Sequence, residues 1–254
     1  MPANKTITSQ KLRIFKLLSQ TFKLWKGNFN VFTKIVLVIA IPSAILNILQ
    51  TQGLIGEYGL LLSIAWSFSI IAILQNSAKK NIDSPKKIGE IFTNASGRLL
   101  QYIAISLIQI VFLLPAITGI FGAFLAVPVL NVPFWYFVPF GLVGIVLGSY
   151  LISRYIVAQS AGVIENQSIV GSFRQSSALT KGSRLRIILG YLVLIIVILL
   201  ILTVVQFVLS LNQSLNENAI LGGAIYVLES IVFVPIFFIY QVKIFEALSE
   251  KATS

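Results

Sequence analysis

The sequence has no cysteine and no histidine among its 254 residues, and charged side chains make up only 11% of it. Without cysteine there are no disulfides, thiolate metal sites or cysteine nucleophiles. Without histidine there is no imidazole base and no imidazole metal ligand. These absences exclude most familiar catalytic sites, so we expect a protein that is not an enzyme and that carries no metal and no cofactor.

Apolar residues are what the sequence has in excess. Hydrophobic residues make up 57% of the chain, and the mean hydropathy is +0.92. Soluble domains contain about 25% charged residues, and a water-exposed surface of the present composition could not be covered with polar groups. Lipid is the expected solvent, and the sequence predicts an all-α integral membrane protein.

Uncharged stretches divide the chain into segments that match the roughly 20 residues needed to cross the hydrocarbon core. The stretch 99–153 is too long for one helix, and Pro128, Asn131 and Pro133 predict a turn in its middle. The sequence therefore predicts about six transmembrane helices, over residues 31–49, 59–75, 99–125, 133–153, 187–211 and 219–245.

The basic residues support this span count and fix its orientation. All 19 Lys and Arg residues lie in segments 5–34, 79–98, 154–186 and 243–251, which six spans place on one side of the membrane. The only charged residues in the opposite loops are Glu57 and Glu217. The positive-inside rule then predicts that both termini lie in the cytoplasm. We expect a multi-pass protein of a bacterial-type cytoplasmic (plasma) membrane. Nucleic acid is not an expected partner, because the charges form no separate polar domain.

Three of the basic segments are predicted to be amphipathic helices that lead into a span. Their apolar stripes are Leu12, Phe15, Leu18, Phe22 and Trp25 in the first, Ile88, Ile91, Phe92 and Ala95 in the second, and Ile169, Phe173 and Leu179 in the third. Ser84 with Pro85, and Ser168, are the expected N-terminal caps. Such helices either lie among anionic lipid headgroups or pack against the bundle as elbows. Membrane lipid is the expected partner, and a protein partner stays open.

The elbows also indicate an internal repeat. Gln20, Leu24, Lys26 and Gly27 recur at identical spacing as Gln175, Leu179, Lys181 and Gly182, and Gly97-Arg98 is a weaker third copy. Each glycine is expected to end an elbow helix with a positive φ. The predicted unit is an elbow helix, a glycine break and two spans, used three times. One polytopic domain, 1–254, would then contain a first elbow (1–30), the first spans (31–76), and two further units (77–153 and 154–248).

The third elbow carries the most specific motif. Arg154 ends the fourth span, and the matching positions that follow are Glu165, Phe173, Arg174, Ser176, Leu179, Thr180, Lys181 and Gly182. This motif resembles the membrane domain attached to some glycerophosphodiester phosphodiesterases and the related YciC-like bacterial inner-membrane proteins. Ser172 and Ser177 depart from the family pattern. The resemblance implies the membrane fold alone, because the phosphodiesterase chemistry of those proteins belongs to a separate soluble domain with essential histidines.

Glu229 is the sharpest single candidate for function. It lies near the middle of the sixth predicted span, where a carboxylate costs a few kcal/mol or more unless it is neutralised, paired or hydrated. One interpretation is a proton- or cation-coupling site. The others are a protonated acid that bonds another helix, at Gln206 or Gln109, and a group at the rim of a shallow outer cavity.

Two functional hypotheses follow from these features. The first is a non-catalytic membrane protein that takes part in lipid organisation or homeostasis, based on the basic elbows and the sparse polar content of the spans. The alternative is a small transporter or permease, based on Glu229 and the repeat. A glycine stripe at Gly141, Gly144 and Gly148 allows close helix packing, either within the bundle or between copies.

Overall fold

The computed structural model describes residues 13–54, 56, 59–78, 88–130, 138–210 and 219–253. Every regular element in those ranges is an α-helix, so the predicted all-α class is confirmed. The helices are α1 (Ile14–Gly27), α2 (Phe29–Thr51), α3 (Gly59–Ser77), α4 (Ile88–Ser96), α5 (Leu99–Leu130), α6 (Val138–Tyr155), α7 (Ala158–Glu165), α8 (Ile169–Leu179), α9 (Arg184–Ser210) and α11 (Ala219–Thr253).

Four helical segments are long and apolar enough to cross a membrane: Phe29–Thr51, Gly141–Glu165, Arg184–Val208 and Ile220–Ala252. Gly89–Ser96 and Leu99–Pro115 together form a fifth candidate, with a bend of 62° between the two parts. Leu61–Ser77, which coincides with the predicted second span, is a shorter apolar helix. The part of the chain that the structure describes thus has four or five helices able to span a bilayer, where the sequence predicts about six.

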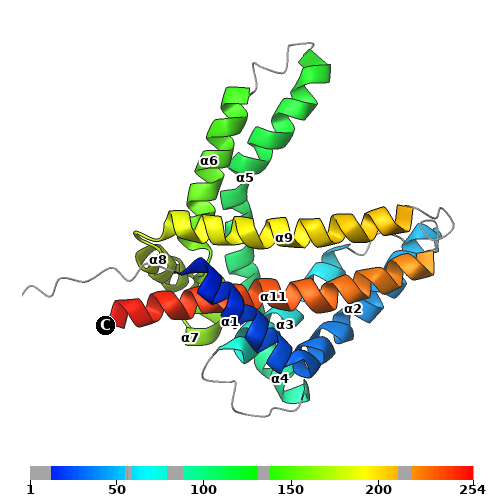
Figure 1. Cartoon of the computed structure of the whole chain (residues 1–254), viewed down its shortest axis with the longest axis horizontal. Helices are drawn as coiled ribbons and strands as arrows, with labels where there is room; N and C mark the ends of the chain where they lie inside the picture. Colours follow the sequence, from blue (N-terminus) through cyan, green and yellow to red (C-terminus); the bar gives the residue numbers. More distant parts are fainter. Residues whose placement is uncertain are drawn as a thin grey trace, which may run out of the picture.

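The long helices diverge from a common base (Figure 1). α5 and α6 form a hairpin that extends away from α9 and α11, while α4, α7 and α8 lie near the base. α11 packs along α2 and also contacts α1, α3, α7 and α8. This central position brings α11 into contact with helices from both the first and the third elbow.

Buried apolar side chains form two clusters that share α11. The first joins α2, α3 and α4 to α11 and includes Phe32, Leu74 and Ile239. The second joins α1, α7 and α9 to α11 and includes Tyr191 and Tyr240. Their burial supplies the largest favourable contribution to packing, at about 1.5–3 kcal/mol for each large apolar side chain.

Burial is concentrated at the ends of the long helices that adjoin the basic segments. On α9, Ile187 and Leu194 are buried, whereas Leu200 and Val204, farther from the basic end, are each 62% exposed. Exposed apolar surface of this extent is unusual for a protein in water. The parts of the long helices farthest from the basic segments therefore have the apolar surface that contact with lipid requires.

Two sequence expectations about helix ends are wrong. Pro128 was expected in a turn, but α5 continues to Leu130, since long apolar helices can tolerate a proline. Gly27 and Gly97 do not have the positive φ expected of them. Only Gly182 does, at 78°, and it follows α8 as predicted. Asn131, Pro133, Ser84 and Pro85 lie outside the described residues.

The glycine stripe on α6 serves packing within the chain. Gly141, Gly144 and Gly148 are buried, whereas Leu142 and Val143 beside them are exposed. α5 is the main neighbour of α6. Positions without side chains allow close helix packing, and their burial favours packing within the chain over contact between copies.

Candidate functional site at the break between α6 and α7

A short break separates α6 from α7. α6 ends at Tyr155, and α7 begins at Ala158 after Val157 as its N-terminal cap residue. The last carbonyl groups of a helix have no partner within it, so they need donors from elsewhere. In an apolar interior, each such group left without a donor costs roughly 1–3 kcal/mol.

α8 supplies donors to the last turn of α6. The hydroxyls of Ser176 and Thr180 both donate to the Arg154 carbonyl oxygen, at 3.0 and 3.2 Å. The Arg154 side chain turns back to α8, where its Nε donates to Ser177 Oγ at 2.7 Å. Its guanidinium also lies 5.1 Å from the ring centroid of Tyr155. Together these contacts fasten α8 to the end of α6.

Two other helices supply amide donors to the next two carbonyls. Gln109 Nε2 from α5 donates to the Tyr155 carbonyl at 2.7 Å, and Gln241 Nε2 from α11 donates to that of Ile156, also at 2.7 Å. Gln241 Nε2 also lies 3.1 Å from Gln159 Oε1 on α7. Three consecutive carbonyls, at residues 154–156, are therefore bonded by side chains from α8, α5 and α11.

The N-terminus of α8 is capped as the sequence predicts. The Ser168 side chain caps it by accepting a hydrogen bond from the Gly171 backbone N–H at 3.1 Å. Ser172, a position that departs from the family pattern, is buried beside Gly162, where an added Cβ would lie 3.0 Å from its hydroxyl oxygen. The face that α8 buries most completely is thus its hydroxyl-bearing face, which the apolar stripe did not predict.

The remaining residues of the third-elbow motif take other positions. Glu165 Oε2 accepts a hydrogen bond from Gln175 at 2.6 Å on the surface. Leu179 packs against the cluster of α1, α9 and α11. Arg174 and Lys181 are exposed, as expected for residues that face solvent or headgroups.

Glu229 is not part of this site. It lies in α11 and is half-buried, and its Oε1 is buried with no hydrogen-bond partner within the described residues. Gln109, one of its two proposed partners, bonds Tyr155 instead. Gln206, the other, is exposed on α9. No hydrogen bond described for these three residues joins Glu229 to either amide.

Sequence reasoning found Gln109, Ser176 and Thr180 but missed Gln101 and Gln159. Gln101 bonds the Gln167 carbonyl, and Gln159 Nε2 donates to Ser106 Oγ at 3.0 Å. The available signal was the set of glutamines in otherwise apolar helices near the basic ends. It did not show which carbonyls those amides reach.

The chemistry of the site is hydrogen bonding between amides, hydroxyls and carbonyls, none of which titrates near neutral pH. Within the described residues, no group of three or more Asp or Glu side chains could hold a metal ion. The arrangement is suited to holding helix ends together. The described part of the chain is thus all-helical, and several of its helices are able to cross a membrane. Hydrogen bonds at the α6–α7 break join these helices at one end. A search of family models, of curated proteins and of solved structures found no match to this chain.

Proposed function

We propose that this protein is a polytopic membrane protein that organises lipid at the cytoplasmic headgroup layer without catalysing a reaction. In this proposal it has six spans in three elbow-plus-hairpin repeats, with both termini in the cytoplasm. The predicted second span, 59–75, overlaps the shorter apolar helix Leu61–Ser77, which supports counting it as the sixth. The confinement of all Lys and Arg residues to four alternate segments supports the orientation.

The observation that carries the proposal is the way α1 packs. α1 buries Leu17 and Thr21 against the bundle, whereas Phe15 is 79% exposed and Phe22 42% exposed. Lys23, beside Phe22, is exposed as well. The predicted apolar stripe of this helix is therefore divided: Leu18 and Trp25 pack against the bundle, whereas Phe15 and Phe22 face outward. Exposed aromatic residues beside a lysine are the arrangement of a helix in an anionic headgroup layer.

The use of the buried amides also favours an organising role. Gln109 and Gln241 are committed to carbonyls at the α6–α7 break, so they hold helices together rather than line a path for a polar solute. Interhelical bonds of this kind are worth roughly 0.6–2 kcal/mol each. They give the elbows a rigid base on which to present their outer faces.

Trp25 is half-buried on α1, one helical turn after the exposed Phe22, and its fluorescence allows a direct test. The chain has three tryptophans, so Trp66→Phe with Trp135→Phe leaves Trp25 as the single fluorophore. In proteoliposomes, we expect brominated phosphatidylglycerol to quench Trp25 more strongly than brominated phosphatidylcholine at equal mole fraction. The physical reason is that the lysines of α1 attract anionic lipid, which raises its concentration around this helix.

Replacing Lys16, Lys23 and Lys26 by Gln should remove the difference between the two lipids. Arg174→Gln, which neutralises an exposed charge on α8, serves as the control and should leave the difference intact. Equal quenching by both lipids in the protein with its lysines present would contradict the proposal.

A small transporter is the second candidate, and Glu229 is the observation that favours it. Its buried and unpartnered oxygen lies in a helix able to cross the membrane, and such a group has a strong demand for a proton or a cation. Infrared difference spectra of reconstituted protein, with Glu229→Gln as reference, would identify its carboxyl band. A band that titrates near neutral pH and shifts when a solute is added supports transport. A band that stays protonated and ignores every solute contradicts it.

A further inference from the structure

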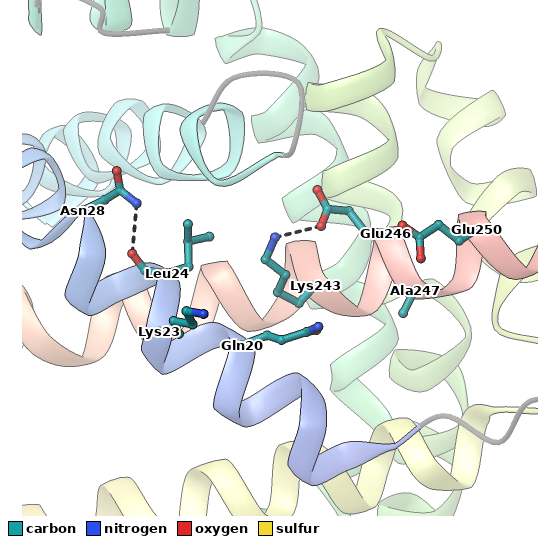
Figure 2. A pocket seen from close by; sticks show the side chains of 8 residues that line it. All are labelled: Gln20, Lys23, Leu24, Asn28, Lys243, Glu246, Ala247 and Glu250. Carbon is teal, nitrogen blue, oxygen red and sulfur yellow. Dashed lines mark hydrogen bonds and ion pairs between the residues drawn. The ribbon is translucent and has the colours of Figure 1, made fainter. Parts of the chain in front are cut away.

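A groove of about 460 Å³ lies between α1 and the C-terminal part of α11. Figure 2 shows its walls, with one row of side chains from each helix. The lining residues are Gln20, Lys23 and Leu24 from α1, its C-terminal cap residue Asn28, and Lys243, Glu246, Ala247 and Glu250 from α11. Its volume is within the usual range for small-ligand sites, roughly 300–1,000 Å³.

The length of α11 places this groove at the depth of the lipid headgroups. A helix rises about 1.5 Å per residue, so about 20 residues cross the hydrocarbon core. If the hydrocarbon core begins at Ala219, the first residue of α11, a crossing of that length ends close to Ile239, within the predicted span 219–245. Lys243 then lies about one helical turn beyond the hydrocarbon boundary, and Glu246 and Glu250 follow at one-turn intervals.

Charges of both signs line the groove. Lys243 is only 8% exposed, and its ammonium pairs with Glu246 Oε2 at 2.8 Å. Glu250 lies one turn farther along α11, and Lys23 faces from α1. A ligand of a single sign would meet both an attractive and a repulsive group. A ligand with a phosphate and an ammonium a few atoms apart would be attracted at both ends.

We propose that this groove binds the headgroup of an amine-bearing zwitterionic phospholipid of the phosphatidylethanolamine type. The phosphate contacts Lys23 and Lys243, and the primary ammonium contacts the carboxylates of Glu246 and Glu250. Leu24 and Ala247 contact the apolar part of the lipid. A choline headgroup fits less well, because its methylated nitrogen has no N–H to donate. The inference rests on the proposed lipid-organising function and adds the lipid class and the residues that select it.

Native mass spectrometry of the full chain tests this proposal. The protein is released from nanodiscs that contain phosphatidylethanolamine, phosphatidylcholine and phosphatidylglycerol in equal amounts, and the retained lipid is counted. We expect phosphatidylethanolamine to be retained in preference to the other two. Lys23→Gln and Glu250→Gln should each lower its retention about tenfold or more, the effect of losing one charge-assisted hydrogen bond.

Both substituted residues are exposed, so the variants keep the buried Lys243–Glu246 pair and should fold. Arg174→Gln is the matched control outside the groove and should retain the lipid fully. Equal retention of the three lipids, or unchanged retention in both groove variants, would overturn the proposal. Tighter binding of free phosphoethanolamine than of the lipid would also overturn it, because the ligand would then be soluble.

The lipid-retention test of the groove and the Trp25 quenching test of the proposed function can fail independently. Preferential retention of phosphatidylglycerol alone would refute the groove while agreeing with anionic lipid around α1. Retention of phosphatidylethanolamine without any preference in Trp25 quenching would refute the anionic layer and leave the groove standing.

Discussion

Single side chains decide how the helices of this protein meet. Gln241, Gln109 and Thr180 each bond a carbonyl at the break between α6 and α7. Inside a helix bundle that faces lipid, no water is available to donate hydrogen bonds to these carbonyls in place of the side chains. The stability of the base of the bundle therefore depends on amides that are far apart in the sequence.

Replacing Gln241 by Leu keeps the volume of this buried residue but removes the donor to the Ile156 carbonyl. We expect a loss of about 1–2 kcal/mol in the free energy of unfolding. Thermal unfolding in detergent, followed by tryptophan fluorescence, would record it as a lower Tm. Gln206→Leu removes an amide that is exposed on α9 and should leave the Tm unchanged. Equal shifts in the two variants would contradict the role assigned to Gln241.

Gly190 is required by its contact with α11. A Cβ added there would overlap the hydroxyl oxygen of Tyr240, so Gly190→Ala should destabilise the protein by about 1–3 kcal/mol. Gly222→Ala adds the same methyl group to a helix position with open space around it, and we expect no loss there. Because the Tyr240 hydroxyl has no hydrogen-bond partner within the described residues, Tyr240→Phe should rescue much of the defect. Wild-type stability of Gly190→Ala would refute this account.

Among the elements, α8 shows how much of an elbow helix follows from local sequence. Ser168 caps its N-terminus and Gly182 follows its end with a positive φ, both as the sequence predicts. Which face of the helix is buried was not predictable in the same way. Ser172, Ser176 and Thr180 are buried because α6 and α7 offer carbonyl groups and a close backbone on that side.

Removal of the cap should loosen α8 without unfolding the protein. Ser168→Ala is expected to cost about 1 kcal/mol, which corresponds to about fivefold faster hydrogen exchange at the amides of residues 169–172. Hydrogen exchange with mass spectrometry would measure this change. Ser96→Ala is a suitable comparison, because Ser96 bonds the Thr93 carbonyl on an exposed face and caps no helix start. Unchanged exchange in the Ser168 variant would show that the cap does not hold this helix.

At the scale of the whole molecule, the absence of cysteine makes the topology directly testable. We expect single cysteines at Asn131 and Ser214 to react with a membrane-impermeant maleimide from outside intact cells. Cysteines at Ser84 and Ser254 should react only after the membrane is permeabilised. This outcome follows from six spans with the basic segments inside. Labelling of position 84 from outside would refute that arrangement.

Helix existence was predictable from the sequence, and helix boundaries nearly so. The expected spans 31–49 and 219–245 lie within α2 (Phe29–Thr51) and α11 (Ala219–Thr253). α1 shows the limit of such predictions, because its apolar stripe is divided: Phe15 and Phe22 are exposed, whereas Leu18 and Trp25 pack against the bundle. Periodicity identifies an apolar face, but lipid and protein both accept such a face, so periodicity alone cannot say which of them covers it.

The sequence by itself determined the all-helical class, the segments apolar enough for lipid, and the confinement of the basic residues to alternate segments. Each of these depends on composition and short-range periodicity. Only the tertiary structure decided that Gln109, Gln241, Ser176 and Thr180 meet at one helix break, and that α1 forms a groove with α11. Those arrangements depend on which helices are neighbours, and in an apolar bundle many pairings bury similar surface. The few polar contacts distinguish among these pairings, because each buried carbonyl must find its donor.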